Sequence, residues 1–385
     1  MFSSKRIVFF LLFILFVFIL LLWYVQRKTY SENMENIADK EEPETIDDAP
    51  STEDIPKKNP DNELWEAYKP TLIQHEKERH FPYRYLYDQD HNILPIVLVS
   101  GFFRSVNEVN MYHEYVKNGI KVVGITAYKS FPKQITDNTG DGYKQDFTFD
   151  YYANIKNWLC CFRDPHLYGF DERHNLIDIS ESDFYDADES EDTTEKKYDM
   201  IYVCFKDSDE CPMDGWNAVN RNYRLALECL PIIMNEFNLK MLIIGRLNCG
   251  LEKLYGDKLE ILDFMPYHEF QEKLRQSRCL FIPNIYDASP RTVAEALIKD
   301  IPVVMNRSIV CGAKYINQET GELFTDENDL RYSLTKLLAK KDTISPKKWW
   351  KQNYNKKKMA KMFRDFLYKQ YPETLENTTE IHFYM

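Results

Sequence analysis

Residues 279–305 restrict the possible folds of this chain more than any other segment. They read as a short apolar run (279–283), a loop carrying Asp287, a helix that opens at Ser289-Pro290, and a second apolar run (301–305). Apolar runs of this length beside a helix are typical of strands covered on both faces of a parallel sheet. The order strand, loop, helix, strand therefore predicts an α/β domain.

Two carboxylates lie near the start of the predicted helix. Asp287 precedes the expected N-cap, Ser289, and Glu295 follows Asp287 by eight positions in a helix expected to continue to Asp300. Pro290 suits the first helical position, because its missing N–H is one that a helix leaves unpaired. Free helix amides at the end of a strand favour anions, and nearby carboxylates accept sugar or ribose hydroxyls. We interpret Asp287 and Glu295 as site residues, the alternative being two solvated surface acids.

Five spaced features of this region form a larger pattern, which covers about residues 198–340. The features are Pro283-Asn284, Asp287, Glu295-Ala296, Asp-Ile-Pro-Val-Val at 300–304 and Thr-Gly-Glu-Leu-Phe at 320–324. In these features the chain resembles the C-terminal domain of GT-B glycosyltransferases of the retaining E-x7-E type, the family 4-like group 1 enzymes. It departs from that family where Asp287 replaces the first Glu and where Ala288-Ser289-Pro290 replaces Gly-Phe-Gly.

The resemblance implies a fold, an activity and roles for residues. The fold is α/β of the GT-B type, with two Rossmann-like doubly wound domains and a cleft between them. The activity is transfer of a sugar, with retention, from a nucleotide-diphosphate sugar to a glycan, glycoprotein or glycolipid acceptor. Asp287 would then contact the donor sugar and Glu295 the nucleotide ribose.

A diphosphate donor also needs positive charge, which such enzymes usually supply by basic residues rather than by a metal. The Arg of the family's basic pair is absent after the run 200–205, so Lys206 is our first candidate. Other substrate-binding candidates on the donor side are Arg221, Arg246, Ser289 and Arg291. In the first domain, Gly101 follows a predicted strand and Arg104 lies in the next loop. We expect no metal and no cofactor.

Two alternatives remain beside this interpretation. Asp207-Ser208-Asp209 is a D-x-D motif directly after an apolar run, the position from which metal-dependent GT-A transferases bind a divalent cation. The altered first acid and the lost glycines also allow a degenerate GT-B domain that serves as a binding or scaffolding protein. A net charge of −12 and the absence of a P-loop and of G-x-G-x-x-G argue against nucleic-acid, ATPase and dinucleotide functions.

The chain is expected to begin with a cytoplasmic tail (1–6) and a transmembrane signal anchor (7–25). About 19 apolar residues match the roughly 20 that cross a bilayer. An acidic flexible stem (26–63) would follow, because so polar a segment cannot bury enough surface to fold. The prediction is a single-pass type II protein of the Golgi or endoplasmic reticulum membrane, with its catalytic part in the lumen.

The globular part divides into an acceptor-side domain (64–190), a donor domain (198–345) and a basic, aromatic C-terminal helix and tail (346–385). We expect residues 137–174 to be irregular, 180–198 to form an acidic linker, and 216–235 to form one helix. The C-terminal helix is expected to return to the first domain, the alternative being that it lies on an anionic membrane.

Cysteines and glycosylation sequons complete the sequence signals. Some of the eight cysteines are expected to pair in an oxidising lumen, with no deducible connectivity, while Cys204 and Cys279 are expected to be buried as small hydrophobic residues. Of two N-glycosylation sequons, Asn377 is the better candidate, because Asn306 follows a strand beside the proposed donor site.

Overall fold

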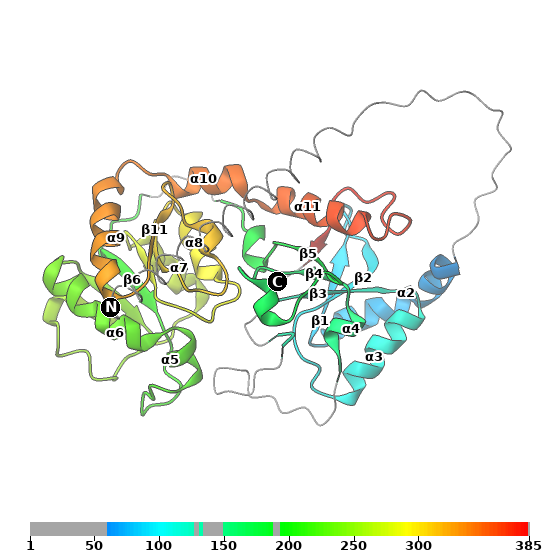
Figure 1. Cartoon of the computed structure of the whole chain (residues 1–385), viewed down its shortest axis with the longest axis horizontal. Helices are drawn as coiled ribbons and strands as arrows, with labels where there is room; N and C mark the ends of the chain where they lie inside the picture. The colour runs from blue at the N-terminus through cyan, green and yellow to red at the C-terminus, as the bar shows by residue number, and fades with distance from the viewer. Residues whose placement is uncertain (1–59, 127–130, 134–148, 188–192, 384–385) are drawn as a thin grey trace, which may run out of the picture. The chain divides into compact units, whose positions relative to one another are not determined.

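The computed structural model describes residues 60–126, 131–133, 149–187 and 193–383, and Figure 1 traces the remaining residues in grey. Within the described residues, no helix is long and apolar enough to cross a membrane. The predicted anchor and nearly all of the predicted stem lie outside them. The last residues of the stem lie inside them, and there helix α2 (Pro60–Glu78) already begins.

A six-stranded parallel sheet lies in the domain that the sequence predicts to bind the donor (198–345). We call it the donor-side sheet, and this part of the chain the donor-side half. Its strands are β6 (Met200–Val203), β7 (Met241–Ile244), β8 (Leu259–Leu262), β9 (Leu280–Ile282), β10 (Val303–Asn306) and β11 (Gly321–Phe324). They lie in the order β11-β10-β9-β6-β7-β8, and every neighbouring pair is parallel. The strand order reverses between β6 and β9, so this sheet is doubly wound, as predicted.

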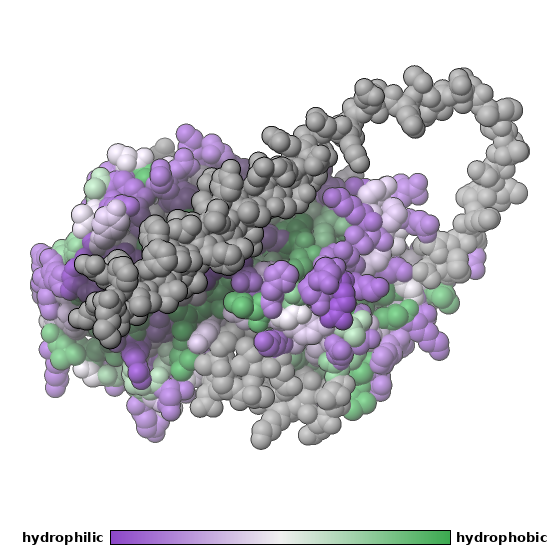
Figure 2. Space-filling model, in the orientation of Figure 1, coloured by the Kyte–Doolittle hydropathy of each residue, from purple (hydrophilic) through white to green (hydrophobic). Residues whose placement is uncertain are grey.

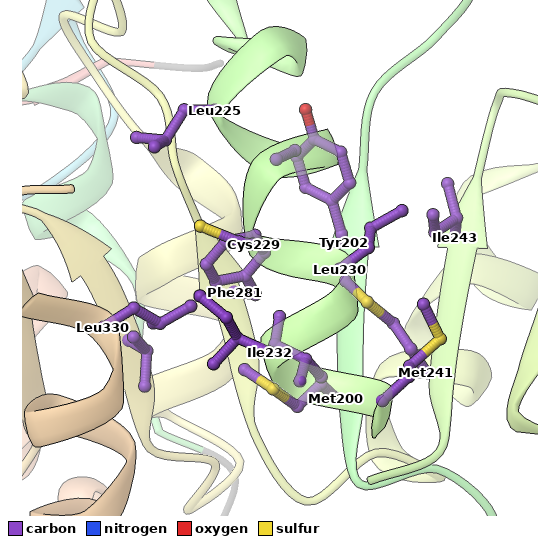
Figure 3. Packing of buried hydrophobic residues seen from close by; sticks show 14 of the residues in the cluster. Met200, Tyr202, Leu225, Cys229, Leu230, Ile232, Met241, Ile243, Phe281 and Leu330 are labelled. Atoms are coloured by element: carbon purple, nitrogen blue, oxygen red, sulfur yellow. The ribbon is translucent and has the colours of Figure 1, made fainter. Parts of the chain in front are cut away.

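Alternate residues of these strands face two separate apolar layers. Met200 and Tyr202 point into one layer, whereas Ile201 points into the other, as the two-residue period of a strand requires. The first layer is covered by α6 (Tyr223–Pro231) and α9 (Glu327–Lys340), and Figure 3 shows its packing around Phe281, Leu230 and Met241. The second layer is covered by α7 (Tyr267–Arg275), α8 (Arg291–Leu297) and α10 (Pro346–Asn353).

The second sheet differs from the prediction. Its strands are β1 (Tyr83–Tyr87), β2 (Ile93–Val99), β3 (Lys121–Ile125), β4 (Asn157–Leu159), β5 (Asn175–Ile177) and β12 (His382–Phe383). From β2 to β5 the strands are parallel and follow chain order, while β1 pairs antiparallel with both β2 and β12. The prediction of two doubly wound sheets is therefore wrong for this half of the chain, because β1 to β5 follow chain order across the sheet and the strand order does not reverse.

Several elements of this half were not predicted. β4 and the short helix α4 (Tyr151–Asn154) fall inside the segment expected to be irregular, and β1 was missed altogether. β4 has only three residues, one of which is the fully buried Trp158, so the hydrophobic run is too short to stand out. Short strands of this kind are held by the neighbouring strands rather than by a local pattern.

The C-terminal helix packs on this second sheet, which belongs to the first domain, as expected. α11 (Lys356–Tyr368) buries Met359, Phe363 and Leu367 against β2 and β3 residues, while α2 and α3 (Val106–Lys117) cover the opposite face. α10 packs on the other sheet through Trp350. The chain thus passes from one sheet to the other between α10 and α11, near Tyr354 (Figure 1).

The helix predicted over residues 216–235 is broken. α5 (Trp216–Asn220) ends before Asn222, which has a φ of 48° and lies in the left-handed region that asparagine tolerates. α6 then ends at Pro231, and Ile232–Glu236 follows as a π-helical turn. Proline lacks the N–H that an α-helix needs, so the change of helix type occurs next to it.

The predicted linker is partly a buried element. Residues Glu181–Phe184 form the 3-10 helix η2, and Asp183 has no exposed surface. Its carboxylate accepts hydrogen bonds from the Tyr315 hydroxyl (2.6 Å), the Ser180 N–H (2.8 Å) and the Lys314 ammonium (3.0 Å). Burial raises the pKa of Asp183, with Lys314 and these donors opposing that rise. The acidity of this segment therefore does not make it a solvated linker.

Hydrophilic side chains cover much of the described surface on the face shown in Figure 2. Apolar residues gather instead in the layers above and below the two sheets. Polar candidate residues are therefore expected around the edges of the two sheets, where loops and helices hold them.

Candidate functional site

The loops after β6 and β9 lie side by side where the strand order of the donor-side sheet reverses. Ile201 of β6 pairs in parallel with Leu280 of β9, so the carboxyl ends of the two strands point the same way. Open α/β sheets bind ligands at this place. The loop after β9 carries Asp287, and the loop after β6 carries Lys206, as expected from the sequence.

Asp287 is held by three groups. The guanidinium of Arg221 donates to Oδ2 in an ion pair, the Asn284 side-chain amide donates to the same oxygen at 3.1 Å, and the Ser289 N–H donates to Oδ1 at 3.3 Å. The side chains of Asp287 and Arg221 keep 15% and 33% of their surface exposed. Because an opposite charge favours its ionised form, Asp287 raises the pKa of Arg221. The structure thus brings together three of the predicted residues: Asp287, Arg221 and Ser289.

The break between α5 and α6 positions Arg221. Its backbone N–H donates to Asn217 O at 2.9 Å and its carbonyl accepts from the Tyr202 hydroxyl at 3.0 Å. The next residue, Asn222, donates from its side-chain amide to Pro283 O at 3.2 Å, at the end of β9. Arg221 is thus fixed at the C-terminal end of α5, just before the left-handed residue, where its side chain pairs with Asp287.

The helix after Asp287 begins later and ends earlier than predicted. α8 covers Arg291–Leu297, with Pro290 as its N-cap, and no side chain caps it. Ser289 is therefore not the N-cap; its hydroxyl lies 3.1 Å from the Ser182 hydroxyl instead. With only seven residues, α8 offers a weaker N-terminal dipole than the long helix predicted from the sequence.

Glu295 lies in the middle of α8 and is only 5% exposed. Its Oε1 accepts hydrogen bonds from the Tyr267 hydroxyl at 3.1 Å and from the Tyr185 hydroxyl at 3.4 Å. Burial and the negative charge of Glu295 raise the pKa of Tyr185 to about 12, so this hydroxyl stays protonated and able to donate at neutral pH. Glu295 is thus a buried acid held by two phenols, and not a solvated surface residue.

Arg291, at the start of α8, is exposed. Its positive charge lowers the pKa of Tyr185 and of Tyr267, against the larger opposing effects of burial and of Glu295. It therefore lies close to the Glu295 cluster and contributes positive charge there.

Lys206 lies beside the end of β7. Its backbone N–H donates to Gly245 O at 2.8 Å, and its ammonium pairs with Asp209 at 2.8 Å. Gly245 has a φ of 99°, and a Cβ there would lie 2.7 Å from Phe205 Cα, so only glycine permits this close approach. Asp209 has an almost fully exposed side chain and raises the pKa of Lys206.

Both aspartates of the D-x-D motif have partners within the protein. Both oxygens of Asp207 accept backbone N–H groups at the start of α5, from Asn217 at 2.8 Å and from Ala218 at 3.3 Å. Asp207 is therefore a helix cap, while Asp209 pairs with Lys206. Across the described residues, no group of three or more His, Cys, Asp or Glu side chains is arranged to hold a metal ion.

Arg246 is completely buried. Its Nε and Nη2 donate to the Cys204 thiol at 3.4 and 3.3 Å, its guanidinium lies 4.2 Å from the centre of the Tyr223 ring, and its Nη1 has no hydrogen-bond partner. Arg246 and Arg221 both act electrostatically on Cys204 and Tyr202, so the two arginines belong to one region. Arg246 influences this region by its charge rather than by an exposed contact.

The first-domain candidates lie around the other sheet. Gly101 is buried just after β2, and the guanidinium of Arg104 stacks 3.8 Å from the centre of the Phe81 ring. The structure therefore places Arg104 on an aromatic ring of its own half of the chain.

Sequence reasoning missed Tyr185, Tyr267 and Asn284 as site residues. Tyr185 and Tyr267 contact Glu295 from 110 and 28 positions away, and neither lies in a recognisable motif. Asn284 was noted only as part of the pattern; it is buried, donates to Asp287, and leaves Oδ1 without a hydrogen-bond partner. Its place directly after a buried strand is a signal that could have identified it.

No protein-family model matches this sequence, and no curated protein sequence matches it significantly. Solved structures do resemble this one. One is TarM, with a TM-score of 0.50 and 14% identity, where the match covers 72% of this chain and 54% of TarM, so this chain spans about half of that protein. Another is the lipopolysaccharide outer core galactosyltransferase WaaB in its apo form, with a TM-score of 0.51, 9% identity and 80% of each chain covered. These likenesses, together with the two sheets, show that the described chain has the two-domain α/β GT-B fold.

Proposed function

We propose that this protein is a glycosyltransferase that moves a sugar from a nucleotide-diphosphate sugar to a glycan, glycoprotein or glycolipid acceptor. The observation that carries the proposal is the joint placement of Arg221, Asp287 and Glu295 around the strand reversal of the donor-side sheet. A diphosphate needs positive charge, which Arg221 supplies. The hydroxyls of a sugar and of a ribose need acceptors, which are the carboxylates of Asp287 and Glu295. The GT-B fold supports the same class of reaction, as does a galactosyltransferase among the similar structures.

Each residue has a distinct task in this proposal. Arg221, with help from Lys206 and Arg291, binds the diphosphate and stabilises the negative charge that develops on it as the bond to the sugar breaks. Asp287 accepts hydroxyls of the donor sugar, and Ser289 lies beside it. Glu295 accepts hydroxyls of the ribose. Once the donor has bound, these groups are in place around it, which lowers the barrier because little reorganisation is needed as the bond to the sugar breaks.

Arg221 must exchange partners for this to occur. In the structure it is paired with Asp287, and both side chains are partly exposed. A diphosphate brings more negative charge than one carboxylate and takes bidentate hydrogen bonds from a guanidinium. Its arrival would draw Arg221 away from Asp287, and the carboxylate would then be available for the donor sugar.

The mode of reaction and the location complete the proposal. Transfer proceeds with retention of anomeric configuration, without a metal or a cofactor. The protein is anchored in the Golgi or endoplasmic reticulum membrane through residues 7–25, with the transferase part in the lumen. The length and apolar character of that segment support the anchor. No nucleic acid takes part.

A donor panel tests the proposal. The purified full-length chain is incubated with UDP-, GDP-, ADP- and dTDP-sugars, with and without EDTA, and release of the nucleoside diphosphate is measured. We expect release with one nucleotide class, unaffected by EDTA and abolished in Glu295→Ala. Glu228→Ala, which removes an exposed carboxylate of α6, is the matched control and should keep full activity.

The outcomes separate the proposal from its alternatives. Loss of activity with EDTA that Mn²⁺ restores would overturn the metal-independent mechanism. Nucleotide binding without turnover for any donor would favour the degenerate, non-catalytic role. Neither binding nor turnover would overturn the glycosyltransferase proposal. Proton NMR of the first product reports its anomeric configuration, and an inverted product would refute retention.

A further inference from the structure

Two tyrosine hydroxyls converge on a single oxygen of Glu295. Tyr267, the first residue of α7, donates to Oε1 at 3.1 Å, and Tyr185, directly after η2, donates to the same atom at 3.4 Å. Within the described part of the chain, Oε2 of Glu295 takes part in no hydrogen bond. The carboxylate is thus hydrogen-bonded through Oε1, while Oε2 keeps its capacity to accept a hydrogen bond.

The two hydrogen bonds restrict rotation of the Glu295 side chain. Glutamate has three rotatable bonds, and holding it in one orientation costs conformational entropy. Hydrogen bonds to a charged carboxylate are stronger than neutral ones, so two donors on Oε1 can meet that cost before a ligand arrives. A preorganised acceptor binds its ligand more tightly than one that must be ordered on binding.

Tyr185 is itself held by rigid surroundings. Its backbone carbonyl accepts from the buried Trp350 indole N–H at 2.8 Å. The preceding helix η2 carries a capping box formed by Ser180 and Asp183, and both residues are fully buried. The position of Tyr185 is therefore set by η2 and α10, which are distant from α8 in the sequence.

We propose that Tyr185 and Tyr267 are positioning residues, which orient Glu295 so that its Oε2 binds the ribose hydroxyls of the donor nucleotide. The inference rests on the proposed function and specifies how that site recognises ribose. Tyr267 makes the shorter hydrogen bond, so it contributes more than Tyr185. Each tyrosine acts through Glu295 and neither replaces it.

Nucleoside diphosphate binding to the full-length chain tests the inference. The dissociation constants of UDP, GDP and ADP are measured by calorimetry for wild type, Tyr185→Phe, Tyr267→Phe and the double variant. The nucleotide that binds is then replaced by its 2′,3′-dideoxy analogue. All measurements are repeated in a Glu295→Ala background, and thermal unfolding confirms that each variant is folded.

A matched control exists in the same half of the chain. Tyr198 donates its hydroxyl to Glu260 at 2.9 Å, at the opposite end of the sheet. Tyr198→Phe removes the same kind of tyrosine-to-glutamate hydrogen bond and should leave nucleotide binding unchanged.

We expect the double variant to weaken ribonucleotide binding about three- to tenfold, the effect of losing one ordinary hydrogen bond, because the tyrosines act through Glu295 and do not touch the nucleotide. The dideoxy analogue should bind all variants and wild type alike, and the tyrosine substitutions should have no further effect in the Glu295→Ala background. If ribonucleotide binding is weakened by Glu295→Ala but not by the tyrosine substitutions, this inference alone is wrong. Equal weakening for the dideoxy analogue would also overturn it, whereas no binding to wild type would overturn the proposed function as well.

Discussion

Arg221 donates to the carboxylate of Asp287 in an ion pair that joins the end of α5 to the loop after β9. The two residues are 66 positions apart, and each keeps part of its side chain exposed. A partly exposed ion pair contributes little to stability, because solvent screens it and each side chain loses freedom. Breaking this pair should therefore cost little, which is what an exchange of Arg221 from Asp287 to a diphosphate requires.

Substitutions of this pair should separate donor binding from transfer. We expect Arg221→Ala to weaken nucleoside diphosphate binding about tenfold or more, because a charge-assisted contact to phosphate is lost. Asp287→Asn should leave that binding nearly unchanged but strongly reduce sugar transfer. Calorimetry and the donor assay measure the two effects. Arg224→Ala, which removes an exposed arginine of α6, is the control, and equal nucleotide affinity in Arg221→Ala and wild type would contradict the assigned role.

The buried guanidinium of Arg246 leads to a prediction about stability. No carboxylate contacts it among the described residues; it is bonded to the Cys204 thiol, and Nη1 lacks a partner. A buried charge without a counter-charge is costly, so Arg246→Met, which keeps the length and removes the charge, should maintain or raise the melting temperature.

Arg246→Ala provides the comparison, since it removes both the charge and the packing on Tyr223. We expect it to lower the melting temperature, because large-to-small substitutions in a core leave a cavity. If Arg246 instead serves the nucleotide through its charge, a saturating nucleoside diphosphate should stabilise wild type more than Arg246→Met. A marked loss of stability in Arg246→Met without nucleotide would show that the charge itself supports the fold.

A disulfide between Cys211 and Cys249 links the loops that follow β6 and β7. Closing a loop of 38 residues removes entropy from the unfolded chain. The double variant Cys211→Ser/Cys249→Ser should therefore have a free energy of unfolding lower by about 2–4 kcal/mol, as measured by urea denaturation. Dithiothreitol should abolish the difference between the variant and wild type.

Titration of free thiols tests independently whether Cys211 and Cys249 form a disulfide. The other six cysteines are free and buried, and burial raises the pKa of Cys160, Cys229 and Cys279 to about 12. Because a raised pKa lowers the thiolate fraction, these thiols should not react in the native protein at pH 8. Six thiols should react after denaturation, and eight after denaturation with reduction. Eight without reductant would exclude the disulfide.

The two sequons give a test of the proposed lumenal location. Asn377 is exposed, whereas Asn306 is 2% exposed and its side-chain amide donates to Pro283 O at 3.2 Å. A glycan needs a solvent-exposed asparagine. In secretory cells we expect the full-length chain to carry one glycan, which Asn377→Gln removes and Asn306→Gln does not. An endoglycosidase shift on gels measures this, and a chain without any glycan would speak against lumenal exposure of Asn377.

The sequence predicted the donor-side half of the chain well because its signals are local. The strands on either side of α8 were expected to within a few residues, since each is a short run of apolar residues that is buried on both faces. The other half was predicted less well. β4 and β5 have three residues each, and their strand state depends on pairing with neighbours that are distant in the chain.

The sequence by itself determined which charged residues follow the strands, with Lys206 and Asp287 in the loops and Glu295 in the next helix. Only the tertiary structure decided what those residues contact. Arg221, at the end of α5, pairs with Asp287 of the loop after β9, and Glu295 is bonded to hydroxyls from α7 and from the segment after η2. A charge pattern is a property of the chain, whereas burial and hydrogen-bond partners depend on segments that folding brings together.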